Sequence, residues 1–442
     1  MSSSGLSVAP ICHRRRMPTR PAAHLVADLA EALTGGGTLP LGIRCWDGSE
    51  VPGPPGSPTL VVSSPRALRR IVYSRGELGL ARAYVSGELD IEGDVFEVLA
   101  LPDALAERPS LTLEGGRVRS LLTELLRAGV FGPPLPPPPE EIRMRGLRHS
   151  LRRDRAAISH HYDVGNDFYA LLLGPTLVYS CAYFATPETS LDDAQVAKLD
   201  LVCRKLDLRP GMRLLDVGCG WGSLVLHAAA NYGVDAVGVT ISPEQADLAR
   251  RRITKAGLGD RVEIRLQDYR EVADCPYDAI ASVGMAEHVG RAQLPAYAAG
   301  LHALLAPGGR LLNHAIARGP AAGPDTGDAR TFLARYVFPD GELQSLADHV
   351  GFLEQAGFEV RDVEGLREHY ALTCRAWVAN LQAGWQDALR VVSPARARVW
   401  RLYLAGAALA FEGRRVGVNQ ILATRTTDPG HWPLRRPNWS RD

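Results

Sequence analysis

Lysine is the scarcest charged residue of this 442-residue chain: of its 50 basic residues, only Lys198, Lys205 and Lys255 are lysines. So strong a preference for arginine is explained by a GC-rich genome, and the number of arginines therefore indicates little about function. The 49 acidic residues leave a net charge of +1. This balance excludes a generally polybasic protein that coats nucleic acid, so any attraction to phosphate groups has to be local.

Cysteine pairs at metal-binding spacing are also lacking. The seven cysteines are odd in number and scattered, and they contain no C-x-x-C pair. This spacing excludes the usual zinc sites and a disulfide framework, because both need ordered pairs of cysteines. We therefore expect no bound metal and a chain that works in a reducing cytoplasm.

Long apolar runs are absent as well. None reaches the roughly 20 residues needed to cross a bilayer. The basic start at Arg14–Arg16 is not followed by the apolar segment of a secretory signal. If the substrate lies in a membrane, the protein has to reach it from one side.

Length and proline content divide the chain. At 442 residues it exceeds a single core of typical size, so two domains are expected. Six of the seven residues Pro133–Pro139 are prolines, which favours an extended spacer. The sequence predicts a disordered leader at 1–20, a mixed α/β domain at 21–130, a Pro-rich linker with a basic segment at 131–158, the main domain at 159–426 and a tail at 427–442.

The basic segment holds six arginines between Arg143 and Arg155, opposed only by Asp154. A solvated helix in an arginine-rich chain explains these residues, and so does a patch that faces phosphate groups. In the domain before it, Leu41–Trp46 and Thr59–Val62 are interpreted as one small strand-turn-strand unit.

Short apolar strands alternate with helices through the main domain. Strands are expected at Arg213–Val217, Val234–Val239, Val262–Leu266, Ala279–Val283 and Arg310–Ile316, with helices such as Gly222–Tyr232, Pro243–Ala256 and Gln293–Leu305 between them. Apolar strands joined by helices indicate a parallel sheet covered on both faces. The predicted fold is therefore α/β: a Rossmann-like, mostly parallel, doubly wound sheet, preceded by a smaller mixed α/β domain.

The segment Leu214–Gly222 places Asp216 at the end of the first strand and then Gly218, Gly220 and Gly222 before a helix. Glycines there let a ligand approach the backbone, and ligands of such sheets bind at the carboxyl ends of the strands. The D-x-G-x-G-x-G spacing differs from the dinucleotide fingerprint, whose glycines serve a pyrophosphate. S-adenosylmethionine has an amino-acid end and a ribose instead, so the pattern favours it, with another nucleotide as the alternative.

The next two strand ends supply polar side chains. Ser242 as N-cap and Gln245 three residues later form a capping box. Thr240 stands where many methyltransferases carry an acidic residue for the ribose, and Gln245 can both cap the helix and contact the ligand. Gln267 and Asp268 follow the third strand and are placed to meet the adenine edge.

Further stretches are similar to one family. They are His161–Tyr169, Tyr179–Phe184, Val283–Gly290 and His314–Ile316. Together with Asp216–Gly222, called the glycine loop below, and Thr240–Gln245, they resemble the cyclopropane-fatty-acyl-phospholipid synthases and their mycolic-acid-modifying relatives. The resemblance runs in register from about Ser159 to Gln420, and more faintly through Leu80–Leu89. It implies a class I S-adenosylmethionine-dependent methyltransferase.

Carried over by position, the resemblance implies two groups of site residues. The donor group joins the glycine loop and consists of Tyr179, Ser180, Thr240, Gln245 and Asp268. The anion group binds a bicarbonate ion and consists of Cys181, Glu287, His314, Tyr370 and the backbone of Ile316. Cys181 can equally be a small buried residue. On its own, His314 would be interpreted as an ordinary core histidine. Its assignment to the site depends on the presence of Glu287 and Tyr370 in the same pattern.

The implied reaction transfers a methyl group to the cis double bond of an unsaturated acyl chain in a membrane phospholipid. The π electrons attack the methyl group, a carbocation forms, and bicarbonate takes a proton from the new methyl so that a cyclopropane ring closes. Water has to be excluded because it would quench the cation. The alternatives are methyl- or methylene-branched lipids, a soluble small-molecule substrate, and a lipid-binding module with a vestigial donor site.

Two departures from the family pattern concern the product. Asn313 precedes His314 where many relatives carry an apolar residue, and Ala317–Thr326 is rich in glycine and proline. The resemblance further implies a protein that associates peripherally with the inner face of the membrane, and we expect the domain at 21–130 to take part in this contact. A homodimer is possible, and no nucleic-acid partner is expected.

Overall fold

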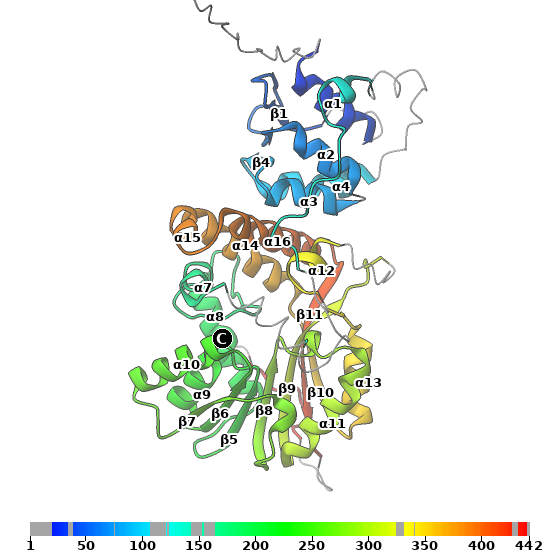
Figure 1. Cartoon of the computed structure of the whole chain (residues 1–442). Coiled ribbons are helices and arrows are strands. Elements are labelled where there is room, and N and C mark those ends of the chain that lie inside the picture. Colours follow the sequence, from blue (N-terminus) through cyan, green and yellow to red (C-terminus); the bar gives the residue numbers. More distant parts are fainter. Residues whose placement is uncertain are drawn as a thin grey trace, which may run out of the picture. The chain divides into compact units, whose positions relative to one another are not determined.

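The computed structural model describes residues 20–33, 39–74, 76–106, 121, 123–142, 153, 164–323, 331–339, 341–426 and 432–439. It divides the chain into two compact units, Met1–Pro136 and Pro137–Asp442, each with its own sheet (Figure 1). The division falls within the run of prolines. Residues 1–19 of the predicted leader and, apart from Arg153, the arginines of the predicted basic segment lie outside the described residues.

The first unit combines a four-stranded sheet with helices. The sheet has the order β2-β1-β3-β4, with β1 at Gly42–Cys45, β2 at Glu50–Val51, β3 at Thr59–Val62 and β4 at Leu89–Glu92. Its helices are α1 (Ala22–Leu33), α2 (Pro65–Tyr73), α3 (Glu77–Val85) and α4 (Val95–Ala106). The mixed α/β composition matches the prediction for this part of the chain.

The pairing within this small sheet differs from the predicted strand-turn-strand unit. β1 pairs antiparallel with β2 across the turn at Asp47 and Gly48, whereas β3 runs parallel to β1. Gly48 adopts a φ of +81°, which suits a tight turn. Parallel strands cannot be joined by such a turn, so the hairpin partner of β1 is the short β2, which the sequence did not reveal.

The second unit is built on a seven-stranded sheet of order β10-β11-β9-β8-β5-β6-β7. The strands are β5 (Arg213–Val217), β6 (Asp235–Thr240), β7 (Val262–Leu266), β8 (Tyr277–Val283), β9 (Leu305–Arg318), β10 (Glu359–Gly365) and β11 (Val416–Thr424). β5 to β9 are mutually parallel, and β11 runs antiparallel between β9 and β10. This arrangement confirms the predicted Rossmann-like, mostly parallel sheet.

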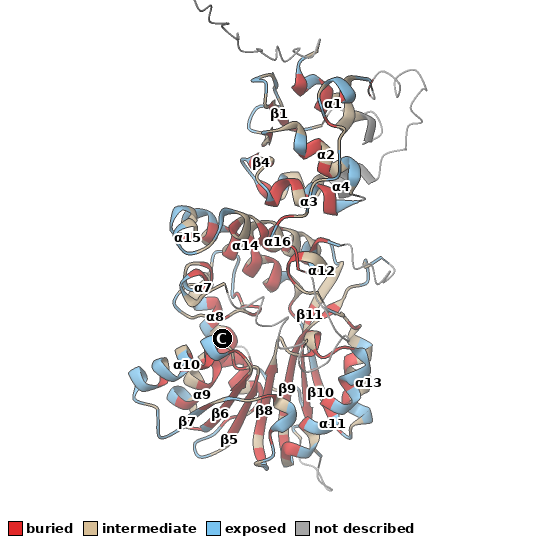
Figure 2. Cartoon of the chain, viewed as in Figure 1, coloured by how far each residue is buried: buried red, intermediate tan, exposed pale blue. Residues whose placement is uncertain are grey.

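Helices cover both faces of this sheet, as its doubly wound pattern requires. Residues of α8 (Leu191–Lys205), α9 (Ser223–Tyr232) and α10 (Pro243–Ala256) belong to one apolar core, and residues of α11 (Leu294–Leu304) and α13 (Leu346–Gln355) belong to the other. Figure 2 shows the strands between them as mostly buried. β6 and β8 flank β5 on opposite sides, so the strand order reverses there. Such a reversal opens a crevice at the carboxyl ends of the strands.

Further helices lie beyond these carboxyl ends (Figure 1). They are α7 (Asn166–Leu173), α12 (Phe332–Tyr336), α14 (Arg367–Ala383), α15 (Trp385–Val391) and α16 (Pro394–Glu412). They carry buried aromatic side chains, among them Tyr169, Trp377 and Trp400. No helix in the described ranges is both long and apolar enough to cross a bilayer.

The segment 432–439, within the predicted tail, packs against the second unit. Trp439 is 9% exposed and joins the core on the α8 side of the sheet. Lys205 lies 5.6 Å from the centre of its ring system, and Arg436 forms an ion pair with Asp362 at 2.7 Å. The guanidinium carbon of Arg310 likewise lies over the ring of Trp432, 4.7 Å from its centroid. This part of the tail is therefore a component of the core.

Candidate active site

A pocket of about 1270 Å³, including open solvent at its mouth, lies at the carboxyl ends of β5, β6, β7 and β8. Nine of the ten residues predicted to hold the donor line it: Tyr179, Ser180, Asp216, Gly218, Gly220, Thr240, Gln245, Gln267 and Asp268. Gly222 is not among the lining residues. It precedes α9 as its N-cap, with a left-handed φ of +78°.

The glycine loop needs its glycines for two different reasons. Gly218 has a φ of +79°, and a Cβ atom there would lie 2.5 Å from Cγ of Met285, whose side chain faces the same pocket. A Cβ on Gly222 would lie 3.2 Å from Cβ of Ala249 on α10. The first glycine therefore leaves room beside the ligand space, and the last lets α10 approach the loop.

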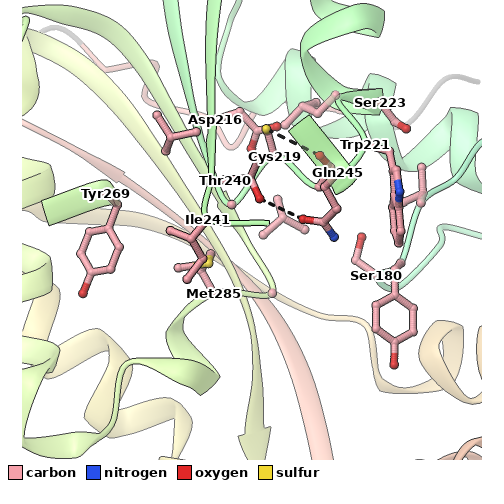
Figure 3. Close-up of a pocket in the computed structure, with 18 of the residues that line it drawn as sticks. Ser180, Asp216, Cys219, Trp221, Ser223, Thr240, Ile241, Gln245, Tyr269 and Met285 are labelled. Atoms are coloured by element: carbon pink, nitrogen blue, oxygen red, sulfur yellow. Dashed lines mark hydrogen bonds between the residues drawn. The ribbon is translucent and has the colours of Figure 1, made fainter. Parts of the chain in front are cut away.

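At the end of β6, half of the predicted capping box is formed. The Ser242 hydroxyl accepts from the backbone N–H of Gln245 at 3.3 Å, but the Ser242 N–H donates to the Thr240 hydroxyl at 3.2 Å. The Gln245 side chain turns to Thr240 instead, whose hydroxyl donates to Gln245 Oε1 at 2.9 Å (Figure 3). Gln245 is thus held over the pocket, and its amide nitrogen remains available as a donor.

The polar residues after β7 are held by local partners. The Asp268 carboxylate accepts two hydrogen bonds of 2.8 Å from the Arg270 guanidinium group. It accepts a third, of 3.0 Å, from the backbone N–H of Arg270. Gln267 donates through Nε2 to the carbonyl of Glu271 at 2.9 Å. Both therefore contribute fixed polar groups to this end of the pocket.

The opposite end of the pocket holds a buried carboxyl and a buried amine. Asp216 is 3% exposed, and burial raises its pKa to about 7, although Lys198 opposes the shift. Lys198 is 2% exposed, and burial lowers its pKa to about 8. The Lys198 Nζ donates to the hydroxyl of Ser180 at 3.0 Å.

Within the predicted anion group, Glu287 lies on the 3-10 turn η2 (Ala286–His288) that follows β8. Its Oε1 accepts from the backbone N–H of Ile316 at 2.6 Å, while Oε2 is buried without a hydrogen-bond partner. Burial raises the pKa of Glu287 to about 7. The Ile316 N–H is thus directed at Glu287, and the anion contact that the resemblance implies for the Ile316 backbone stays a prediction.

His314 lies on β9, and Gln420 of the neighbouring β11 stands opposite it. The amide nitrogen of Gln420 is 3.3 Å from His314 Nδ1. Because an amide nitrogen donates, Nδ1 accepts and Nε2 carries the hydrogen. Nε2 is buried without a hydrogen-bond partner, and burial lowers the pKa of His314 to about 3. The ring is therefore a neutral donor at Nε2.

Tyr370 and Cys181 meet near the start of α14. The Leu366 carbonyl accepts from the backbone N–H of Tyr370 at 3.1 Å and from the Cys181 thiol at 3.6 Å. Burial raises the pKa of both side chains well above their ordinary values, and Cys181 and Glu287 are close enough to add to the shift of Tyr370. Tyr370 therefore keeps its hydroxyl proton, and Cys181 is a neutral thiol that donates to carbonyl groups.

None of the five predicted anion-group residues lines the donor pocket. The two groups are nevertheless joined by Gly284, which lines the pocket and whose N–H donates to the carbonyl of His314 at 2.8 Å. Its neighbour Met285 also lines the pocket and directly precedes η2. The four side chains of the anion group are thus buried in a separate layer that adjoins the pocket.

Asn313 faces away from His314, as neighbouring residues of a strand do. Its Oδ1 accepts from the hydroxyl of Tyr297 at 3.3 Å, and that hydroxyl also lies 2.5 Å from Ser282 Oγ. The polar side chain of Asn313, which departs from the family pattern, thus has its hydrogen-bond partner on the face of the sheet opposite His314. Of the Gly/Pro-rich stretch Ala317–Thr326, the residues from 324 onward lie outside the described ranges.

Two basic residues at the site, Lys198 and Arg252, were not predicted from the sequence. Lys198 could have been found, because a lysine is a rare choice in a chain that otherwise uses arginine. Arg252 on α10 donates to the carbonyl of Trp221 at 2.5 Å, to the Ser223 hydroxyl at 2.9 Å and to the carbonyl of Thr176 at 3.3 Å. It joins three segments around the pocket, and no local pattern distinguishes it from the other arginines.

Comparison with known proteins gives a consistent result. The family model described as mycolic acid cyclopropane synthetase matches residues 149–421. A probable fatty acid methyltransferase of Mycobacterium tuberculosis is 41% identical over 427 residues, which are 94% of this chain and 98% of that protein. A cyclopropane-fatty-acyl-phospholipid synthase of Escherichia coli is 32% identical over 375 residues, 84% of this chain and 88% of that one.

Among solved structures, the mycolic acid cyclopropane synthase CmaA1 in complex with SAH and CTAB has a TM-score of 0.58 and 35% identity. The match covers 61% of this chain and 98% of that one. Family model, full-length relatives and fold therefore agree. The chain belongs to the mycolic acid cyclopropane synthetase family of S-adenosylmethionine-dependent methyltransferases.

Proposed function

We propose that this protein transfers the methyl group of S-adenosylmethionine to the cis double bond of unsaturated acyl chains in membrane phospholipids and closes a cyclopropane ring. The observation that carries the proposal is the pair of buried, unpartnered polar atoms Glu287 Oε2 and His314 Nε2 beside the donor pocket. Donor binding alone does not require them. Ring closure on an alkene does require polar groups that manage a proton after the methyl transfer.

The order of events follows from the chemistry of an alkene. The π electrons attack the methyl carbon, its bond to sulfur breaks, and S-adenosylhomocysteine keeps that electron pair. The other alkene carbon is then a cation. When a proton leaves the new methyl group, the electrons of the broken C–H bond form the last bond of the ring.

The anion group fits a small oxyanion such as bicarbonate. His314 presents a neutral N–H, Tyr370 keeps its hydroxyl proton, and Glu287 with a pKa of about 7 can carry a proton on Oε2. Bound bicarbonate would supply the base for the methyl proton. Three neutral donors suit an anion because none repels it. Glu287 can also release its Oε2 proton again near neutral pH and so pass the collected proton on.

Water exclusion is supported by the aromatic side chains that surround this region. The hydroxyl of Tyr179 lies 3.2 Å from that of Tyr403. The ring of Tyr179 packs against those of Trp377 and Trp400, at centroid distances of 5.2 and 5.8 Å. Tyr370 stacks on Phe411. A carbocation formed here would be protected from hydrolysis to an alcohol.

The test uses purified protein, S-adenosylmethionine and liposomes of an oleoyl phospholipid. We expect S-adenosylhomocysteine and an acyl chain heavier by one CH₂, detected by gas chromatography with mass spectrometry. Liposomes of a saturated phospholipid are the matched control and should give no product. Equal turnover without any lipid would contradict the proposal and indicate a soluble substrate.

A branched lipid is the second candidate, because the relative with 41% identity is named a fatty acid methyltransferase. It arises from the same cation when a proton leaves a neighbouring carbon. With a donor carrying a trideuterated methyl group, ring closure loses one deuterium, whereas a branch formed in this way retains all of them. Retention of every deuterium would exclude the ring and support the branch.

We also propose that the protein reaches its substrate by peripheral contact with an anionic membrane surface, for which the arginines between Arg143 and Arg155 provide the charge. Binding to liposomes with and without anionic lipid, at low and high salt, tests this role. Affinity that is indifferent to both variables would remove it.

A further inference from the structure

Two buried side chains of opposite charge face the donor pocket without an ion-pair partner. Lys198 and Asp216 are 2% and 3% exposed and both line the pocket, yet neither makes an ion pair with any other described residue. The other charged pair of the lining, Asp268 and Arg270, is joined by an ion pair at 2.8 Å. Buried charges in proteins are usually paired. Lys198 and Asp216 thus have the properties of groups whose partners belong to a ligand.

The surroundings of Lys198 direct its charge through Ser180. Its Nζ donates to the Ser180 hydroxyl at 3.0 Å, and an ammonium group has further hydrogens to offer. Gln195 Nε2 donates to the Ser180 carbonyl at 2.9 Å and so fixes the backbone there. Because the Ser180 hydroxyl accepts from Lys198, its own hydrogen is free to be donated into the pocket.

We infer that Lys198, together with Ser180, receives the α-carboxylate of the methyl donor, while Asp216 receives the α-ammonium group. This inference rests on the proposed function, since it assumes that S-adenosylmethionine occupies the pocket. Thr240 and Gln245 at the end of β6, and Asp268 after β7, offer hydrogen-bonding groups to a ribose and an adenine. The end of the pocket at β5 is then left for the amino-acid part, whose two charges are opposite to those of Asp216 and Lys198.

Lys198 is in this sense a binding residue that selects donors with a free amino-acid end. Burial lowers its pKa to about 8 and raises that of Asp216 to about 7. A zwitterionic ligand would reverse both shifts, because each group would gain a partner of opposite charge. A molecule with the same adenosine part but no amino-acid end would obtain neither contact.

The experiment compares two ligands on the full-length protein by isothermal titration calorimetry. They are S-adenosylhomocysteine and 5′-methylthioadenosine, which has the same thioether and nucleoside but no amino-acid end. Lys198→Met should weaken S-adenosylhomocysteine binding by about 10- to 100-fold, the range for a hydrogen bond to a charged group. Its affinity for 5′-methylthioadenosine should be unchanged. An unchanged ratio of the two affinities would overturn the inference.

Lys205→Met is the matched control. Lys205 is also a buried lysine of α8, but it pairs with Glu364 and does not line the pocket. This variant should leave both affinities at the wild-type values. A selective loss of S-adenosylhomocysteine binding in Lys205→Met as well would attribute the effect to helix α8 and overturn the role of Lys198.

A second measurement needs no variant and so does not depend on how Lys198→Met folds. Wild-type protein should bind decarboxylated S-adenosylhomocysteine about 10- to 100-fold more weakly than the parent molecule. Equal affinities would overturn the inference. If the wild type binds no S-adenosylhomocysteine at all, the proposed function itself fails; if it binds and only the Lys198→Met ratio is unchanged, the role of Lys198 alone fails.

Discussion

The backbone nitrogen of Ile316 donates a hydrogen bond to Oε1 of Glu287 at 2.6 Å. This bond connects strand β9 to the turn after β8 and fixes the carboxyl group, so that Oε2 is the oxygen left without a partner. The two oxygens of Glu287 therefore differ: Oε1 has a structural partner, and Oε2 has the chemical role in the proposed reaction. A substitution that keeps the first and changes the second can separate them.

Glu287→Gln is that substitution. The amide oxygen can still accept from Ile316, but an amide cannot take up and release a proton near neutral pH. We expect turnover to fall by about 100-fold or more, the range for losing one organised polar group at a reacting centre. Affinity for S-adenosylhomocysteine should be retained. Glu263→Gln, at an exposed position of β7, is the control and should behave as wild type; wild-type turnover of Glu287→Gln would contradict the proposed chemistry.

The raised pKa values of Asp216 and Glu287 predict how stability depends on pH. Both values are about 7 in the folded protein, against 3.8 and 4.5 ordinarily. Between these limits the folded state binds more protons than the unfolded state, so this contribution to stability is present at low pH and is lost as pH rises through about 7.

Asp216→Asn should therefore raise the melting temperature of the ligand-free protein more at about pH 8 than at about pH 5, because only at the higher pH does it remove a buried charge. Thermal unfolding followed by circular dichroism measures this, with Asp235→Asn at an exposed strand end as the control. A variant that is equally stabilised at both pH values would show that Asp216 does not titrate in this range.

Gly218→Ala tests the glycine loop. A Cβ atom at this position would lie 2.5 Å from Met285 Cγ, and the φ of +79° adds strain. We expect S-adenosylhomocysteine affinity to fall by at least about 10-fold, since a left-handed conformation alone costs a non-glycine residue about 1 to 2 kcal/mol. Gly257→Ala has a similar φ of +68° with open space around it, away from the pocket. It should lose stability but not affinity; equal affinity losses would indicate a general effect of strain.

Trp439→Ala tests the packing of residues 432–439. Trp439 is 9% exposed within the core beside α8, and truncation of a buried tryptophan costs about 3 to 5 kcal/mol. We expect a clearly lower melting temperature with near-normal turnover at low temperature. Leu434→Ala, which removes a fully exposed side chain of the same segment, should change neither. An unchanged melting temperature of Trp439→Ala would show that this segment does not contribute to stability.

Local patterns predicted the parallel half of the large sheet well. The strands β5 and β7 and the helix α10 have the expected boundaries, because continuous apolar runs and a serine-proline cap are signals contained in neighbouring residues. By contrast, β10 and β11 were not predicted. β11 contains Asn419 and Gln420, and Gln420 is acceptable there because it faces His314, about a hundred residues earlier in the chain. Such a partner is not visible in a local pattern.

In the site, too, some features could be predicted from local patterns and others depend on residues far apart in the chain. The glycine loop and the polar strand ends could be predicted to lie together, since the carboxyl ends of parallel strands share one edge. The hydrogen bonds that orient them could not: Gln245 turns to Thr240, and Ile316 donates to Glu287. These depend on side-chain directions that only packing determines. The roles of the anion-group residues remain predictions.

The antiparallel strand β11 lies between β9 and β10 although it is the last of the three in the sequence. During synthesis, β9 and β10 therefore leave the ribosome before their common partner exists, and each presents an unpaired edge that can associate with other chains. Gln420, which orients the histidine of the anion group, arrives with that strand. The nascent protein consequently passes through a stage in which most strands of the sheet have been synthesised but Gln420 has not, and in this stage its unpaired strand edges are most prone to association with other chains.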